Sequence, residues 1–180
     1  MNLKEKYQQE VLPKLKQELG LKNSLAAPKI VKVTLNVGVG KGKDDPKVAE
    51  TAENTLKRIT GQAPVYTKSK KSISAFKVRE GMKVGLKVTL RGRRMWDFLD
   101  KLVRVTLPRI RDFRGLAESS IDRTGNLNIG FKEHIVFPEI KSDEVEKLHG
   151  LEVAITTTAK NSQEAMILFK NLGFPIKESK

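Results

Sequence analysis

The chain has 180 residues, 38% hydrophobic and 31% charged, so it is long enough to bury a core beneath a heavily ionised surface. It contains no cysteine, which excludes disulfides, zinc–thiolate centres and thiol nucleophiles. A net charge of +14 and a pI of about 10.0 favour a nucleic-acid partner, because each neutralised phosphate releases counterions.

The charge is unevenly distributed along the chain. Residues 1–115 hold 27 Lys and Arg and 11 Asp and Glu, whereas residues 116–180 hold 8 and 10. We therefore expect a single domain over residues 1–180, with a basic binding region and a near-neutral region that supports it or faces another partner. No segment has the apolar length of a signal peptide or membrane span, so we expect a soluble, cytoplasmic protein without a membrane partner.

Hydrophobic periodicity predicts the first helix and the first strand of the chain. A four-residue spacing of apolar residues predicts a helix over residues 2–19, which Pro13 should kink or split and Gly20 should end. Alternation predicts a strand over residues 31–39. Its buried positions are Val31, Val33, Leu35, Val37 and Val39, and its polar positions are Lys32, Thr34, Asn36 and Gly38.

The next elements follow the same rules. Asp45 and Pro46 are placed to begin a helix that Gly61 ends, with Val48, Ala52, Leu56 and Ile59 on its inner face. A short strand is expected near residues 65–67, followed by a long basic segment without a clear period. A second alternating strand buries Val84, Leu86, Val88 and Leu90 and exposes Gly85, Lys87, Thr89 and Arg91.

The rest of the chain predicts a helix over residues 93–106, a hairpin over 116–131, a strand over 150–158 and a final helix. The first of these helices should stop at Pro108 and bury Met95, Leu99, Leu102 and Val105. The last should begin after Asn161, with Glu164 completing a capping box, and end at Gly173. Together these elements indicate an α+β fold: an antiparallel or mixed sheet with helices on one face and an open polar face.

The segment Thr34–Asp45, TLNVGVGKGKDD, has the glycines of a phosphate-binding loop but fails the nucleotide-binding patterns. Neither Gly-Lys pair is followed by Ser or Thr, and Lys43 stands where the dinucleotide pattern needs its third glycine. Asp44 would also repel a phosphate. We interpret the segment as a strand-to-helix loop that needs glycine for its backbone angles.

The sequence also lacks patterns of catalytic and metal-binding residues. His134 and His149 have no metal-binding spacing, so we expect structural histidines and no metal. No G-x-S-x-G motif occurs, and Asp97 and Asp100 are expected to be a solvated pair on a basic helix. We therefore predict no catalytic residues, no cofactor and no enzymatic activity.

The segment from Lys68 to Arg91 holds eight cations and one acid, Glu80. Cations neutralise phosphate, hydroxyls bond to phosphate or ribose, and an aromatic ring can stack on a base. We predict an RNA contact here, although Phe76 can either stack on RNA or pack beneath the loop. A second basic cluster, RIRDFRG, either binds phosphate through Arg109, Arg111 and Arg114 or pins the chain after Pro108 with Asp112 as a local partner.

Two rival functions fit the sequence less well. An RNA-modifying or RNA-cleaving enzyme would need a general base or a cofactor-binding loop, and we find neither. A free sequence-specific regulator would usually need a recognition helix; residues 93–106 carry four cations but also a core face. These cations are Arg93, Arg94, Lys101 and Arg104.

Six stretches carry a family resemblance: KVTLNVGVG, ITGQAP, KSISAFKVREGMKVGLKVTLRG, RMWDFLDKLVRVTLPRIRDFRG, FPEI and ITTTAK. Over nearly its whole length the chain resembles the ribosomal protein L5 family of the bacterial large subunit. The resemblance implies a structural constituent that binds 5S rRNA, helps attach it in the central protuberance and contacts 23S rRNA. It further implies contacts with P-site tRNA, with a small-subunit head protein across an intersubunit bridge, and with other central-protuberance proteins.

The resemblance also assigns residues. Family residues that recognise 5S rRNA map onto Asn36, Gln62 and Thr89, and the polar strand faces add four more expected contacts: Lys32, Thr34, Lys87 and Arg91. The basic loop matches the family's tRNA-contacting loop, with these expected residues: Lys70, Lys71, Ser72, Ser74, Phe76, Lys77 and Arg79. Many relatives have Gly at the position of Ala75 and Pro at that of Lys83, so the loop departs from the family in backbone freedom and charge.

Overall fold

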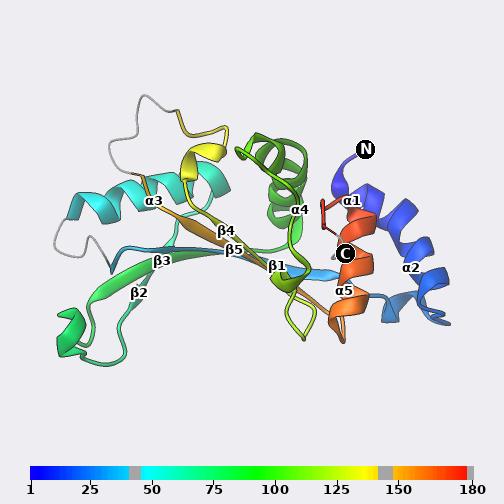
Figure 1. The fold of residues 1–180 in the computed structure, drawn as a ribbon, viewed down its shortest axis with the longest axis horizontal. Coiled ribbons are helices and arrows are strands. Elements are labelled where there is room, and N and C mark those ends of the chain that lie inside the picture. The colour runs from blue at the N-terminus through cyan, green and yellow to red at the C-terminus, as the bar shows by residue number, and fades with distance from the viewer. Residues whose placement is uncertain (41–45, 142–147, 178–180) are drawn as a thin grey trace. The chain divides into compact units, whose positions relative to one another are not determined.

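The computed structural model describes residues 1–40, 46–141 and 148–177. Within these residues, five strands form one sheet in the order β2–β3–β1–β5–β4 (Figure 1). The strands are β1 (Ile30–Gly38), β2 (Val65–Lys68), β3 (Lys83–Leu90), β4 (Leu127–Phe131) and β5 (Leu151–Thr157). The helices are α1 (Leu3–Lys6), α2 (Leu12–Glu18), α3 (Pro46–Thr60), α4 (Gly92–Lys101) and α5 (Ser162–Leu172). The predicted α+β class with an open sheet is confirmed.

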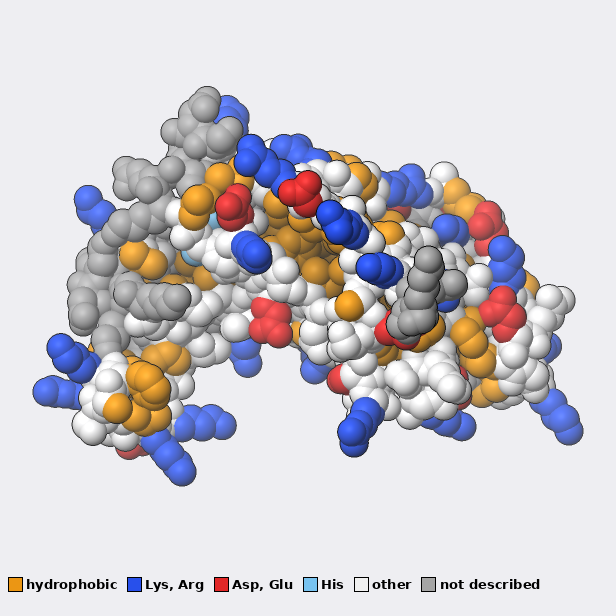
Figure 2. All heavy atoms as spheres, viewed as in Figure 1, with side chains coloured by type: hydrophobic (Ala, Val, Ile, Leu, Met, Phe, Trp, Pro, Cys, Tyr) orange, Lys and Arg blue, Asp and Glu red, His pale blue; other side chains and the backbone are white. Residues whose placement is uncertain are grey.

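The chain divides into two compact units. Unit 1 comprises Met1–Val33, Leu90–Ile129 and Ala154–Lys180, and unit 2 comprises Thr34–Thr89 and Gly130–Val153. Strands β1, β3, β4 and β5 each contribute residues to both units. Lys and Arg side chains are spread widely over the surface viewed in Figure 2, consistent with the net charge of +14. None of the described helices is both long and apolar enough to cross a bilayer.

The N-terminal helix contains the distortion predicted at Pro13. Between α1 and α2 the turn Tyr7–Val11 is π-helical, and the Leu12 N–H donates to the Tyr7 carbonyl five residues back. Proline lacks an N–H and crowds the turn before it, so this wider turn accommodates Pro13 without ending the helix. Gly20 (φ +61°) has the left-handed conformation predicted for the helix end.

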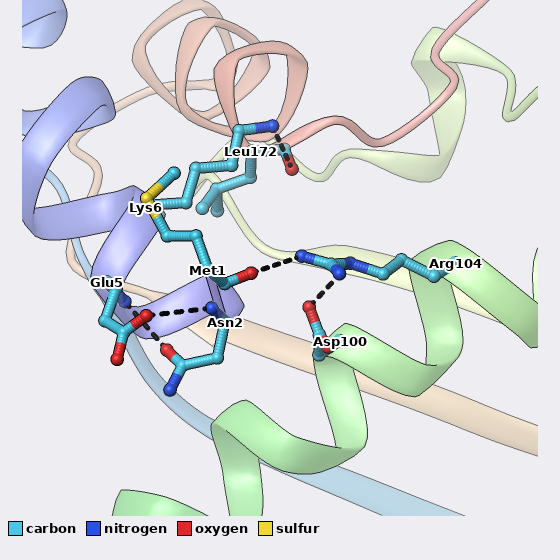
Figure 3. Close-up of polar contacts among 7 residues, drawn as sticks. All are labelled: Met1, Asn2, Glu5, Lys6, Asp100, Arg104 and Leu172. Carbon is cyan, nitrogen blue, oxygen red and sulfur yellow. Dashed lines mark hydrogen bonds and ion pairs between the residues drawn. The ribbon is translucent and has the colours of Figure 1, made fainter.

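Polar contacts in unit 1 tie the beginning of the chain to α4 and α5 (Figure 3). Arg104 donates to the Met1 carbonyl (2.7 Å) and pairs with Asp100 (2.9 Å). Lys6 Nζ donates to the Leu172 carbonyl (3.4 Å) at the end of α5, where the helix dipole favours a cation. Figure 3 also shows the capping box that begins α1.

The alternation predicted for β1 is confirmed from Val33 to Val39 but is wrong at its start. Val31 is 42% exposed, whereas Ile30 is buried. Neighbouring residues on a strand point to opposite faces, so the covered face of the sheet changes at the start of β1.

Gly85 is the second correction on the strands, because it is buried rather than exposed. A Cβ atom at this position would lie 2.8 Å from Thr67 Oγ1 and 3.0 Å from the Val37 carbonyl oxygen. The two neighbouring strands therefore close over Gly85, and only glycine fits without a shift of these atoms.

Helix α3 lies along the sheet in unit 2 (Figure 1). It begins at Pro46 and is followed by Gly61 (φ +64°), as predicted, while the expected cap Asp45 lies outside the described residues. Its inner face buries Ala52, Leu56 and Ile59, and Val48 is half-buried.

Helix α4 continues into a π-helical turn at Leu102–Thr106 before its last turn, Leu107–Arg109, at Pro108. The prediction for Val105 is wrong: it is 39% exposed, and Thr106 is fully buried instead. A π-helical turn holds more residues than an α-helical turn, which moves the next inward position along by one. The other predicted core residues are buried: Met95, Leu99 and Leu102.

Helix α5 is capped nearly as predicted. Asn161 Oδ1 accepts from the Glu164 N–H (2.8 Å), and Gly173 (φ +98°) follows the last turn. The return contact differs from a capping box, because Glu164 Oε2 accepts from the Lys160 N–H (2.9 Å). The predicted hairpin before β4 closes through a bridge between Ile121 and Leu127.

Candidate nucleic-acid interface

The outward face of β1 and β3 in unit 2 carries four of the predicted RNA-contacting residues: Thr34, Asn36, Lys87 and Thr89. Asn36 and Lys87 are exposed, and the two threonines are half-buried. Gly38 lies against Gly85 across the two strands, and an antiparallel register counted from this pair sets Asn36 across from Lys87. The face therefore offers an amide, two hydroxyls and a cation within one short stretch of sheet.

Gln62 lies beside this strand pair although it is distant from Thr89 in sequence. Its Nε2 donates to the Thr89 carbonyl (3.3 Å), and its backbone N–H donates to Thr60 Oγ1 (3.2 Å). The structure thus brings together Gln62 and Thr89, which the resemblance assigns to one function. Lys32 and Arg91 belong to unit 1, where Lys32 is half-buried and Arg91 is exposed, and their membership of this group stays a prediction.

Gly38 and Gly40, the two described glycines after Asn36, do not have the conformation that the prediction required. Gly38 and Gly40 do not have positive φ, and a Cβ atom at either position would meet open space. The interpretation that they are needed for backbone angles is therefore wrong, and Gly42 lies outside the described residues. Gly38 is exposed and has no side chain, so the strand backbone is accessible at this position of the polar face.

Residues 69–82, here called the arm, form an ordered hairpin between β2 and β3 rather than a structureless loop. Backbone hydrogen bonds join Ser69 to Met82 (2.8 Å) and Gly81 (2.9 Å). Nearer the tip, Ile73 and Val78 form an antiparallel bridge. A braced hairpin loses less conformational entropy on binding than a disordered loop does.

The tip of the arm combines cations with apolar surface. Phe76 is 69% exposed and Ile73 is 45% exposed, so Phe76 does not pack beneath the arm. At the lower left of Figure 2, where the arm lies, cationic side chains surround a hydrophobic patch. All predicted arm residues are exposed: Lys70, Lys71, Ser72, Ser74, Phe76, Lys77 and Arg79. The Ser72 hydroxyl accepts from the Glu80 N–H (3.0 Å), which also braces the arm.

Helix α4 buries Met95, Phe98 and Leu99, and arginines of α4 and of the turn after it pair with aspartates of α4, which disfavours a recognition helix. Arg93 pairs with Asp97 (3.7 Å), and Arg104 pairs with Asp100 (2.9 Å). The two aspartates are thus partners of arginines one turn away on the same helix, and they form no acid–base pair.

The structure contradicts one interpretation of the cluster Arg109, Arg111 and Arg114, namely that Asp112 is a local partner of these arginines. All three arginines are exposed, and within the described part of the chain Asp112 forms no ion pair with them. Asp112 has a left-handed backbone (φ +53°) instead. Phosphate binding by these arginines stays a hypothesis.

The two histidine rings lie close together in unit 2, tilted by 51° to each other. Their ring centroids lie 3.9 Å apart, and His134 Nδ1 is 3.2 Å from the His149 carbonyl oxygen. Burial and the nearby His134 lower the pKa of His149 to about 4, and burial also lowers the pKa of His134. Among the described residues no cluster of His, Asp or Glu is arranged to hold a metal ion.

We expect the free energy of unfolding to fall as the pH drops from 7.5 to 5. The pKa of His149 is about 4 in the folded protein and near 6.5 when unfolded, so the unfolded chain takes up the proton first. Its contribution is complete above pH 6.5 and is lost toward pH 4, up to about 2 kcal/mol at pH 5. Urea denaturation at the two pH values measures this loss. His149→Leu should remove this part of the pH dependence, and an unchanged dependence in that variant would contradict the assignment.

A basic α+β protein with an exposed polar strand face and a cationic arm belongs to the class of RNA-binding proteins. Family models narrow the assignment from this class to one family. The model described as ribosomal protein L5 matches residues 23–79, and the model for the C-terminus of the same ribosomal family matches residues 83–176. The chain therefore belongs to the ribosomal protein L5 family of the large subunit.

Curated relatives agree with this assignment. The chain is 52% identical to the large ribosomal subunit protein uL5 of Halothermothrix orenii over 98% of both chains. It is 53% identical to uL5 of Francisella tularensis subsp. novicida, over 97% of this chain and 98% of that one. These relatives are named as ribosomal proteins, which confirms the prediction that the chain is not an enzyme.

Sequence reasoning missed one group of side chains, around Tyr66 in β2. Tyr66 Oη donates to Glu53 Oε2 (2.7 Å), Lys57 pairs with Glu53 (2.6 Å), and Lys83 Nζ lies 4.1 Å from the centre of the Tyr66 ring. These contacts depend on how α3 packs on β2, which the local pattern of neither element predicts.

Proposed function

We propose that the polar face of β1 and β3, together with Gln62, binds 5S rRNA and helps attach it in the central protuberance. The observation that carries this proposal is the hydrogen bond from Gln62 to Thr89, which joins two assigned residues separated by 27 positions. Amides and hydroxyls on an open strand face suit the wide minor groove of RNA, with its 2′-hydroxyls. Lys87 adds a cation to this face, and Lys32 and Arg91 of unit 1 are further expected contacts with RNA.

Asn36→Ala and Thr89→Ala should each weaken binding of 5S rRNA by about 1–3 kcal/mol, because each removes a hydrogen bond to a base or ribose edge. A filter-binding titration at fixed salt measures the change. Asn128→Ala is the matched control, since Asn128 is also exposed on a strand but lies outside the proposed site. Wild-type affinity in both site variants would rule out the strand face as the 5S rRNA contact.

The arm is proposed to contact P-site tRNA. Its exposed cations can neutralise phosphates, and exposed Phe76 can stack on a base or sugar. The basic surface of residues 1–115 also supports a contact with 23S rRNA.

Protein partners are proposed for the near-neutral residues 116–180. A charge of −2 offers little attraction to RNA, which suits a small-subunit head protein across the bridge or other central-protuberance proteins. We further propose that the protein works on the cytoplasmic ribosome as one domain. Sedimentation should show it with large subunits, and depletion of 5S rRNA should remove it; a pool that sediments apart from ribosomes would contradict the proposal.

A further inference from the structure

We propose that Tyr66, Glu53 and Lys83 form a lock at the base of the arm that holds the arm in one direction relative to α3. The proposal rests on the proposed tRNA contact of the arm, and it assigns positioning rather than binding to these residues. All three lie in unit 2, so the contacts that define the lock belong to one compact unit.

The base of the arm needs such a restraint because the strand ladder is irregular there. Tyr66 pairs with Leu86 in regular register, but the register shifts between Thr67 and Lys68, and Lys68 pairs with Lys83. A bulge of this kind bends a strand pair and interrupts its hydrogen bonds. The arm begins one residue beyond the bulge, so the ladder alone fixes its direction poorly.

The lock spans the three elements that meet at this point. Tyr66 projects from β2 and donates through Oη to Glu53 Oε2 on α3 (2.7 Å). Lys83, the first residue of β3 after the arm, lies over the same ring at 4.1 Å, in the geometry of a cation–π contact. A single aromatic ring thus connects the returning strand of the arm to α3.

Both oxygens of the Glu53 carboxylate have a partner. Lys57, one turn along α3, pairs with Glu53 Oε1 (2.6 Å), while Tyr66 occupies Oε2. These two partners lower the pKa of Glu53, and the contact with Glu53 raises the pKa of Tyr66 to about 12. The phenol therefore stays a donor and the carboxylate an acceptor at neutral pH.

The lock is separate from the core that holds α3 in place. Ala52, Leu56 and Ile59 are buried, whereas the Glu53 and Lys57 side chains are 27% and 47% exposed. Removing the lock should consequently free the arm without unfolding unit 2.

Spin labels can measure the direction of the arm directly, because the chain has no cysteine. We would label Ala75→Cys at the tip and Asn54→Cys on α3, both exposed, and record the distance distribution by pulsed electron resonance. The intact lock should give one narrow distribution, and Tyr66→Phe or Lys83→Met should broaden it. Tyr7→Phe, which removes a tyrosine hydroxyl bonded to the Pro28 carbonyl in unit 1, should leave it narrow. Unchanged widths in the two lock variants would overturn the proposal.

A second measurement separates the lock from the tRNA contact on which it rests. In assembled ribosomes, cross-linking of the whole protein to P-site tRNA should drop several-fold in Tyr66→Phe, while affinity for 5S rRNA stays at the wild-type value. If the distribution broadens but even removal of the arm leaves tRNA cross-linking unchanged, the lock stands and the proposed tRNA contact fails. If arm removal abolishes cross-linking and Tyr66→Phe leaves it unchanged, the lock does not position the arm for tRNA.

Discussion

Replacing residues 70–81 with Asn-Gly is expected to abolish cross-linking to P-site tRNA and to leave the affinity for 5S rRNA largely unchanged. Ser69 N–H donates to the Met82 carbonyl (2.8 Å), so these residues already form the kind of pair that a two-residue turn closes. The replacement removes every exposed cation of the arm together with Phe76. It leaves the proposed 5S rRNA residues Asn36, Gln62 and Thr89 in place.

A charge-only variant separates the two contributions of the arm. Changing Lys70, Lys71, Lys77 and Arg79 to Gln keeps the hairpin and Phe76 but removes four cations. Its loss of tRNA cross-linking should be partial and should shrink at high salt, because phosphate contacts are screened whereas stacking is not. If the arm replacement lowers 5S rRNA affinity as much as Asn36→Ala does, the division into two RNA-binding surfaces is wrong.

Strand alternation predicted most of the candidate 5S rRNA face from the sequence. The two-residue period placed Asn36 and Lys87 outward, and both are exposed. It failed at Gly85, whose burial depends on Thr67 of the adjacent strand. The period of one strand carries no information about the side chain across from it, so it could not predict that Thr67 covers Gly85.

Contacts between distant segments were not predictable from local patterns. The hydrogen bond from Gln62 to Thr89 requires the end of α3 to meet β3, and the lock requires Glu53 to face Tyr66. The exchange of Val105 for Thr106 in the core has a similar origin, since no residue in that segment signals a π-helical turn. Tertiary packing decides all three.

Gly125→Ala is expected to lower the free energy of unfolding by about 2–4 kcal/mol. Gly125 has a left-handed backbone (φ +80°), which costs a side-chain-bearing residue about 1 kcal/mol. An added Cβ atom would also lie 2.7 Å from Ala159 Cβ and 3.1 Å from the Asn161 carbonyl oxygen. Neither neighbour is the end of a flexible side chain, so relief requires the backbone to move.

Movement at Gly125 would in turn break a buried contact, because the Thr157 hydroxyl donates to the Gly125 carbonyl at 2.6 Å. Gly20→Ala provides the matched control, since Gly20 also has positive φ (+61°) but a Cβ atom there meets nothing within 4 Å. Urea denaturation should therefore show a loss of about 1 kcal/mol for Gly20→Ala and a clearly larger loss for Gly125→Ala. Equal losses would mean that the backbone angle alone sets the cost, and that the turn yields to the methyl group without strain.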